Sequence, residues 1–193
     1  MFLRMLLICI FLGATPCVAD ERILYNFETT DAAEDWQTVN DGVMGGRSDG
    51  RFKINAENNM VFFGTLSLEN NGGFASVRSS ESKLGIQNGD TIVIRVRGDG
   101  RPYNLNLYVP RNVSRNSYRQ RFDTQRDEWI EVTLPMEKFL ATWRGQVMPN
   151  DKLDPQNISA MGFQLSDGQA GPFELEIDWI QVKSPAPKSP NAD

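Results

Sequence analysis

The chain has 193 residues, a formal net charge of −5 and 40% hydrophobic residues, with two cysteines and no histidine. A chain of this length can bury the core of one ordinary domain. The missing histidine excludes Ser-His and Cys-His nucleophilic catalysis and His-ligated zinc, so we expect a protein that binds a partner and does not catalyse.

The first 19 residues resemble a secretory signal peptide. A short positive start that ends at Arg4 precedes an apolar run, and small residues stand before the expected cleavage after Ala19. The alternative is a membrane anchor, which needs about 20 apolar residues, whereas Gly13 and Pro16 interrupt this shorter run. We therefore expect an exported protein, either periplasmic or secreted. Cleavage would remove both cysteines, leaving no disulfide and no cysteine metal site.

Short runs of alternating apolar and polar residues fill the rest of the chain. Turn-forming stretches such as "NNGG", "QNGD" and "SDGQAGP" separate nearly all of them. The expected strands are residues 23–27, 51–56, 60–68, 74–79, 91–97, 103–109, 117–124, 129–134, 158–165 and 173–182. Residues 135–143 favour a helical turn. This pattern predicts an all-β fold, a two-sheet jelly-roll sandwich over residues 20–183, followed by a disordered Pro-rich tail at 184–193.

The stretch "VNDGVMGGRS" at residues 39–48 is a glycine-rich loop between two strands. It matches neither the dinucleotide-binding pattern nor a P-loop, so we expect no nucleotide. Glycine permits positive φ and close approach to a surface, and we expect the loop to fold across one mouth of the sandwich, with Asp41 and Ser48 bonding its own backbone. The alternative is that it merely closes over Trp36. The candidate binding residues in it are Asp41, Gly42, Val43, Met44, Gly45, Gly46 and Ser48.

Strand alternation predicts a polar sheet face rich in arginine. Between residues 95 and 126 there are eight arginines, no lysine and two aspartates, a local net charge of +6 in an acidic chain. The guanidinium group suits carboxylates, phosphates and sugar hydroxyls. The alternative is that these arginines pair with nearby carboxylates. If the strands are neighbours, the face carries Arg95, Arg97, Asn104, Asn106, Tyr108, Arg119, Arg121 and Gln164. The acidic chain argues against nucleic acid as a partner.

A sharp turn follows the strand that ends at Arg97. We expect Asp99 to cap this turn by accepting backbone N–H bonds. Arg97 lies two residues earlier on the expected polar face. It is therefore placed either to pair with Asp99 or to bind an anion.

Several motifs together resemble the complex I intermediate-associated protein family. They are Trp36-Gln37 with "VNDGVMGGRS", "IRVRGDGRPY" at 94–103, "LPMEKF" at 134–139, "WRG" at 143–145 and "GFQLSDGQAGPFELEIDWI" at 162–180. The resemblance implies a galactose-binding-like jelly roll and a non-catalytic, chaperone-like assembly factor. A protein partner would then contact the glycine-rich loop, the arginine face, Trp143 and Arg144. The expected signal peptide departs from the transit peptide of mitochondrial members.

Two other classes of function remain open. A carbohydrate-binding module could hold a glycan through Tyr108, Arg95, Asn104 and Gln164, and such jelly rolls often carry a structural calcium. Glu28 and Asp178 are the calcium candidates, although a calcium site needs six to eight oxygens. A glycoside-active enzyme would need a carboxylate pair. No spacing singles one out, even with Asp41 or Asp99 as a member.

Overall fold

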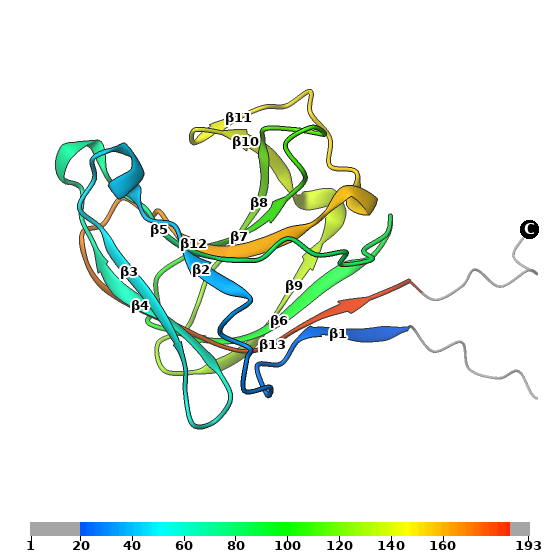
Figure 1. Ribbon diagram of the computed structural model, residues 1–193, viewed down its shortest axis with the longest axis horizontal. Helices are drawn as coiled ribbons and strands as arrows, with labels where there is room; N and C mark the ends of the chain where they lie inside the picture. The colour runs from blue at the N-terminus through cyan, green and yellow to red at the C-terminus, as the bar shows by residue number, and fades with distance from the viewer. Residues whose placement is uncertain (1–19, 186–193) are drawn as a thin grey trace, which may run out of the picture.

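Two antiparallel β-sheets packed face to face make up the protein, as Figure 1 shows for the computed structural model. The structure describes residues 20–185, apart from the side chains of Val43 and Met44. The expected signal peptide, and the expected tail from residue 186 onward, lie outside this range. No helix within the described part of the chain is long and apolar enough to cross a membrane. The all-β sandwich prediction is confirmed.

The first sheet, sheet A, has six strands in the order β3-β4-β13-β6-β9, with β1 pairing to β13. Its strands are β1 Glu21–Tyr25, β3 Asp49–Ile54, β4 Met60–Leu66, β6 Thr91–Gly98, β9 Trp129–Pro135 and β13 Gly171–Lys183. The long strand β13 contacts three partners, β1, β4 and β6. It therefore organises this sheet.

The second sheet, sheet B, has seven strands in the order β11-β10-β8-β7-β12-β5-β2. Its strands are β2 Trp36–Thr38, β5 Ala75–Ser79, β7 Tyr103–Tyr108, β8 Ser117–Phe122, β10 Leu140–Trp143, β11 Gln146–Val147 and β12 Ala160–Leu165. Four short 3-10 helices, η1 Asp41–Met44, η2 Glu69–Asn71, η3 Met136–Lys138 and η4 Pro155–Asn157, interrupt the loops.

The helical segment expected at residues 135–143 is shorter than expected. Only η3 is helical, and the second half of the segment forms strand β10. Arg144 and Gly145 both take positive φ, at 48° and 83°. This pair turns the chain so that β10 pairs with β11 as well as with β8. Strand pairing thus replaces the rest of the expected helix.

The core lies between the sheets, where alternate residues of each strand meet. On β6, Ile92, Ile94 and Val96 are fully buried, and on β7 so are Leu105 and Leu107. Each buried side chain of this size stabilises the fold by about 1.5–3 kcal/mol. The alternation that fills the core also fixes which polar residues face outward.

The prediction of a single arginine-rich face is wrong, because the strands that carry its residues belong to different sheets. Strand β6 lies in sheet A, whereas β7, β8 and β12 lie in sheet B. The chain crosses between the sheets in the turn 99–102. Arg95 and Arg97 therefore lie on the outside of sheet A, where the ring of Trp129 lies within 4.8 and 5.0 Å of their guanidinium carbons.

The two arginines of sheet A are paired with carboxylates of β13. Arg97 Nε donates to Glu176 at 2.9 Å, and Arg95 bonds Asp178. A β-bulge between Ile177 and Trp179 changes the parity of β13. Arg97 does not pair with Asp99, because Glu176 stands directly opposite it in the sheet.

Asp99 caps its turn as expected. Its carboxylate accepts from the backbone N–H of Arg101 at 3.0 Å, and from Glu174 N–H at 3.1 Å. It also accepts from the Tyr103 hydroxyl at 3.2 Å. The turn that carries the chain from sheet A to sheet B is thus held by Asp99, together with the Thr124 hydroxyl, which accepts from Gly100 N–H and donates to the Arg101 carbonyl.

Glu176 gives a prediction on acid stability. Burial alone raises the pKa of its carboxyl, but hydrogen bonds from Asn59, Arg97 and Asn55 outweigh burial and hold the pKa below the usual 4.5. A lowered pKa stabilises the fold above the unfolded-state pKa, and this stabilisation is lost as the pH falls through the folded-state value. Glu176→Gln should cost about 1–3 kcal/mol at neutral pH. Its stability should also fall less steeply than wild type between about pH 5 and pH 3.

Urea unfolding across that pH range measures this effect. The exposed Glu137, which lies in η3, supplies the control variant Glu137→Gln. Equal acid sensitivity of the wild-type and Glu176→Gln proteins would contradict the assigned role of the carboxylate.

Candidate functional site

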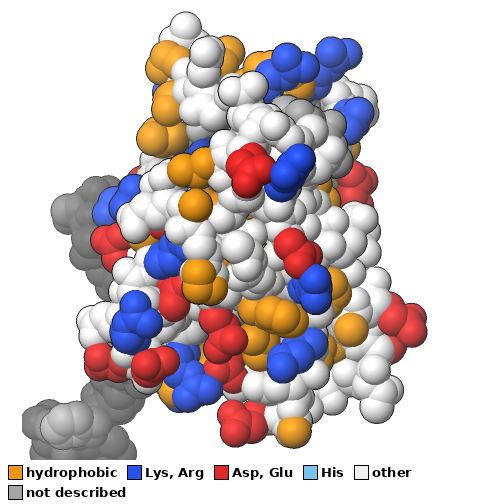
Figure 2. All heavy atoms as spheres, turned by 90° about the vertical axis from the view of Figure 1, so that its left-hand side faces the viewer, with side chains coloured by type: hydrophobic (Ala, Val, Ile, Leu, Met, Phe, Trp, Pro, Cys, Tyr) orange, Lys and Arg blue, Asp and Glu red, His pale blue; other side chains and the backbone are white. Residues whose placement is uncertain are grey.

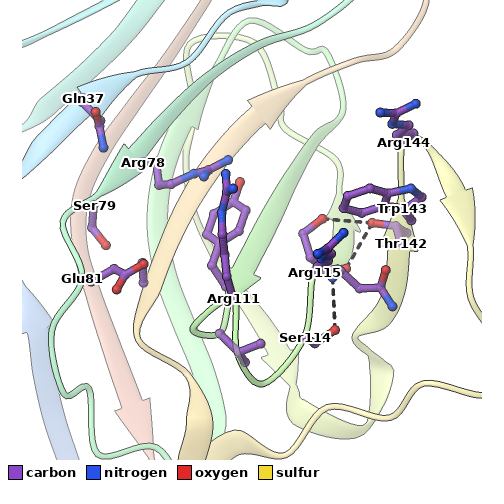
Figure 3. A pocket seen from close by; sticks show the side chains of 15 residues that line it. Gln37, Arg78, Ser79, Glu81, Arg111, Ser114, Arg115, Thr142, Trp143 and Arg144 are labelled. Carbon is purple, nitrogen blue, oxygen red and sulfur yellow. Dashed lines mark hydrogen bonds between the residues drawn. The ribbon is translucent and has the colours of Figure 1, made fainter.

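A groove crosses the outer face of sheet B, with a volume of about 650 Å³ (Figure 3). Strands β2, β5, β7, β8, β10 and β12 all contribute residues to it. Its side chains include Gln37, Arg78, Tyr108, Arg111, Arg115 and Trp143. We call this hollow the groove.

A row of residues in register crosses the outer face of sheet B, beginning at two residues that line the groove. Gln37 stands opposite Arg78, and Arg78 opposite Gly162. Gly162 stands opposite Asn106, and Asn106 opposite Arg119. Five neighbouring strands therefore place two arginines on one face, separated by a glycine and an amide.

Tyr108 provides an aromatic surface beside this row. The guanidinium carbon of Arg78 lies 3.7 Å from the centre of its ring, a cation–π arrangement. Burial raises the pKa of the Tyr108 phenol, although the charges of Arg78 and Arg119 partly oppose the increase. The phenol therefore stays neutral at physiological pH and keeps its proton as a donor.

The arginines of the groove have no acidic partner. Among residues 20–185, no carboxylate lies within ion-pair distance of the groove residues Arg78, Arg111, Arg115 and Arg144, or of Arg119 on the same sheet face. Several other arginines are paired, and Arg101 and Asp167, for example, form a bridge of 2.7 Å that is largely buried. Burial lowers the pKa of Arg119, with no carboxylate to compensate. The groove is therefore a site of uncompensated positive charge.

Three buried polar atoms of the row lack a hydrogen-bond partner within the described part of the chain. They are Arg78 Nε, Arg119 Nε and Asn106 Oδ1. Asn106 is 2% exposed, and its amide donates to Gln164 Oε1 at 3.0 Å. An unsatisfied buried polar atom costs about 1–3 kcal/mol.

The edges of this face are polar, with one exposed aromatic side chain. Trp143, at the end of β10, has 42% of its surface exposed, and the Arg144 guanidinium lies 5.7 Å from its ring centre. Asn104 stands opposite Arg121, and Asn104 bonds Ser166 at 3.3 Å. The sheet face thus brings together every residue predicted for it except Arg95 and Arg97.

The glycine-rich loop is built around the buried carboxylate of Asp41. Its two oxygens accept from the Ser48 backbone at 2.9 Å and hydroxyl at 2.6 Å, and from the backbone of Gly73 at 2.7 Å and Phe74 at 3.3 Å. Burial raises the pKa of Asp41, but these bonds outweigh it and lower the pKa overall. The expected bonding of the loop to its own backbone is confirmed.

Two glycines make this arrangement possible. Gly45 takes φ 90° just after η1, a conformation that favours glycine. At Gly46 an added Cβ would lie 2.3 Å from Asp41 Cγ. The loop therefore needs these glycines in order to close around Asp41, and this explains why the stretch is rich in glycine.

Trp36 has aromatic neighbours outside the loop. That indole packs edge-on against Tyr25, with ring centres 5.0 Å apart, and lies 5.9 Å from Phe27. In Figure 1 the loop follows β2 at one edge of sheet B, while the β10–β11 hairpin forms the opposite edge. Val43 and Met44 are at the loop tip, and their side chains lie outside what the structure describes.

Each calcium candidate has a hydrogen-bond partner of its own. Glu28 accepts from the Asn26 amide at 2.7 Å, and Asp178 bonds Arg95. Residues 20–185 hold no group of three or more His, Cys, Asp or Glu that could bind a metal.

The sequence did not predict the part of the groove formed by Gln37 and Arg78. Strand β2 has three residues, too short for alternation to be recognised. Arg78 alternates with the buried Val77 and Ser79 in β5. Its outward direction could therefore have been predicted from the alternation of the sequence. What the sequence did not show is that β5 lies beside β12, which creates the arginine row.

Charges are distributed differently elsewhere on the molecule. On the side at the left of Figure 1, acidic and basic side chains lie close together in the lower half, as Figure 2 shows. Two exposed ion pairs in the described chain are Arg47–Glu69 and Arg51–Asp49. The groove differs from these places because only one acidic residue, Glu81, lines it and no ion pair neutralises its arginines.

Comparison with known proteins adds family relationships. The profile of a family described as "Complex I intermediate-associated protein 30" matches residues 25–177. The mitochondrial protein of that name from Mus musculus is 32% identical over 183 residues, covering 83% of this chain and 56% of the relative. Its counterpart from Drosophila melanogaster is 24% identical over 184 residues, covering 83% and 62%. The chain thus spans little more than half the length of these relatives.

Solved structures share the fold at low sequence identity. The family 11 carbohydrate-binding module of a Clostridium thermocellum cellulase has a TM-score of 0.61 at 15% identity, covering 87% of this chain and 96% of the module. The agarase AgWH50C has a TM-score of 0.57 at 14% identity, covering 90% of this chain and 25% of the agarase. At such identities the likeness shows a jelly-roll fold alone.

The prediction of an exported protein, periplasmic or secreted after cleavage near Ala19, is wrong. The relatives from mouse, Drosophila and Neurospora crassa are all named mitochondrial. A short positive and apolar N-terminal stretch does not by itself identify the compartment, and residues 1–19 lie outside the described structure.

The Asp41 arrangement yields a prediction on stability. Gly46→Ala places a methyl group against a carboxylate that four hydrogen bonds hold in place. We expect it to lower the free energy of unfolding by about 1–3 kcal/mol. Gly42→Ala is the matched control, since its Cβ would meet no atom within 4 Å. Urea denaturation of both variants measures the difference, and equal midpoints would contradict this account of the loop.

Proposed function

The chain belongs to the complex I intermediate-associated protein 30 family, and from that premise we propose that it is a non-catalytic, assembly-factor-like domain that binds a protein of a complex I intermediate. The relatives' names support an association with complex I. The observation that supports the proposal most is the groove, because its arginines have no acidic partner in the described chain.

The chemistry of the groove suits binding better than catalysis. Its lining has a single carboxylate, Glu81, whereas glycoside hydrolysis uses a pair. Asp41 and Asp99, the carboxylates considered earlier, are occupied by backbone donors of their own loops. Tyr108 is neutral and Arg78 stays charged, so neither serves as a general base at physiological pH.

The glycine-rich loop supplies a second contact region in this proposal. Asp41 ties it to the segment at Gly73, which holds its backbone in one shape. A preorganised loop loses less conformational entropy on binding than a free one. The tip at residues 42–45 would then meet the partner beside the β2 edge of the groove.

A glycan is the second candidate ligand. Trp143 exposes 42% of its surface at the groove, and exposed aromatic rings can stack on a sugar while Arg and Asn bind its hydroxyls. A tetrasaccharide is bound by the Clostridium module with the same fold. A complex I partner remains the preferred proposal because the family relationship supports it.

Photo-crosslinking from the groove tests the two candidates. A photoreactive residue in place of the exposed Gln37 or Arg115 should crosslink to a complex I subunit in mitochondrial membranes. The same residue in place of Arg51, an exposed side chain of sheet A, is the control and should not. Selective binding on a glycan array, with no crosslinked subunit, would favour the second candidate. Crosslinks from position 51 alone would remove the groove from the binding surface.

A further inference from the structure

We infer that the groove recognises an acidic peptide segment, with one carboxylate side chain seated beside Tyr108 between Arg78 and Arg119. The inference rests on the proposed function and names the chemistry of its partner. It starts from the contrast between two sets of arginines in one chain. Arg95, Arg97 and Arg101 are each neutralised by a carboxylate, whereas the groove arginines are not.

The seat for the carboxylate is defined by three side chains. The guanidinium carbon of Arg78 lies 3.7 Å from the centre of the Tyr108 ring. Arg78 therefore reaches across β12 to β7, the strand next to β8, which carries Arg119. Arg119 lies on the neighbouring strand β8, two residues from Ser117, which stands opposite Tyr108. A carboxylate placed there meets guanidinium donors from two sides and a neutral phenol donor. Stacking on the ring also restrains Arg78, which reduces the entropy lost on binding.

Further cations extend the seat along the groove. Arg111, Arg115 and Arg144 are exposed and line the same hollow, while Glu81 is its single acidic lining residue. When one carboxylate of the peptide occupies the seat, these arginines can therefore bind further acidic side chains of the same peptide. A segment with several acidic residues fits this arrangement better than an isolated ion.

A peptide suits the groove better than a nucleic acid. The positive charge is confined to one hollow in a chain of net charge −5, whereas nucleic-acid surfaces are basic over a wide area. The groove also crosses the strands of an open sheet face, so an extended chain can lie along it. Such a chain presents alternate side chains to the floor and leaves the others in solvent.

Fluorescence anisotropy with defined peptides tests the inference. The probe is a labelled peptide of alternating Glu and Ser, and the comparison is the same peptide with Gln in place of Glu. We expect the Glu peptide alone to bind, and a tenfold rise in salt to weaken it strongly. Arg78→Gln and Arg119→Gln should each weaken binding roughly tenfold. Arg78→Lys, which keeps the charge but not the planar fork, should restore part of the loss.

Matched variants separate binding from folding. Arg51→Gln removes an exposed arginine of sheet A and should leave binding unchanged. Melting curves report the fold of each variant. If Arg78→Gln or Arg119→Gln unfolds, the rim variants Arg111→Gln and Arg115→Gln take its place, because both side chains are exposed.

Several results would overturn the inference. Equal binding of the Glu and Gln peptides, equal losses for Arg51→Gln, or no binding of the Glu peptide would each do so. Tighter binding of an oligonucleotide or of a β-glucan tetrasaccharide would also overturn it. If groove positions crosslink a complex I subunit while the Glu peptide does not bind, the proposed function stands and the acidic recognition fails.

Discussion

The alternation of side chains along each β-strand is the constraint on which both the core and the groove depend. Strand β7 shows it most clearly, since Leu105 and Leu107 are fully buried between the sheets while Asn106 and Tyr108 belong to the opposite face. Burial of the apolar set fixes the direction of the polar set. The groove is therefore held in place by the free energy that stabilises the core, and needs no support of its own.

The sequence was sufficient for the fold but not for the pairing of its strands. Alternation and turn residues identified the long strands, and a family resemblance supported the jelly roll. Strands β2 and β11 have three and two residues and carry no periodic signal. The arginine face combined strands of both sheets, because alternation shows the parity of Arg95 and Arg119 but not which sheet holds each. That choice depends on contacts between residues far apart in the chain.

Arginine serves two purposes in this protein, and local sequence does not distinguish them. Arg97 and Arg119 both sit in alternating strands, yet the first meets Glu176 across the sheet and the second meets Asn106. The partner across the strand decides whether an arginine is neutralised or remains available. Similarly, the loop at Asp41 could be predicted to bond itself, but its partners at Gly73 and Phe74 lie beyond any local motif.

The bulge in β13 also determines how many residues this strand must contain. Before the bulge Leu175 and Ile177 fill the core, and after it Ile180 and Val182 do so, although their spacing breaks strict alternation. The extra residue reverses the alternation of side chains, so that both halves of the strand place their apolar residues in the core. Removing a single residue there would force a choice between turning Ile180 and Val182 to solvent and sliding β1 along its partner. Length variation in this protein family should therefore fall in the loops and spare this strand.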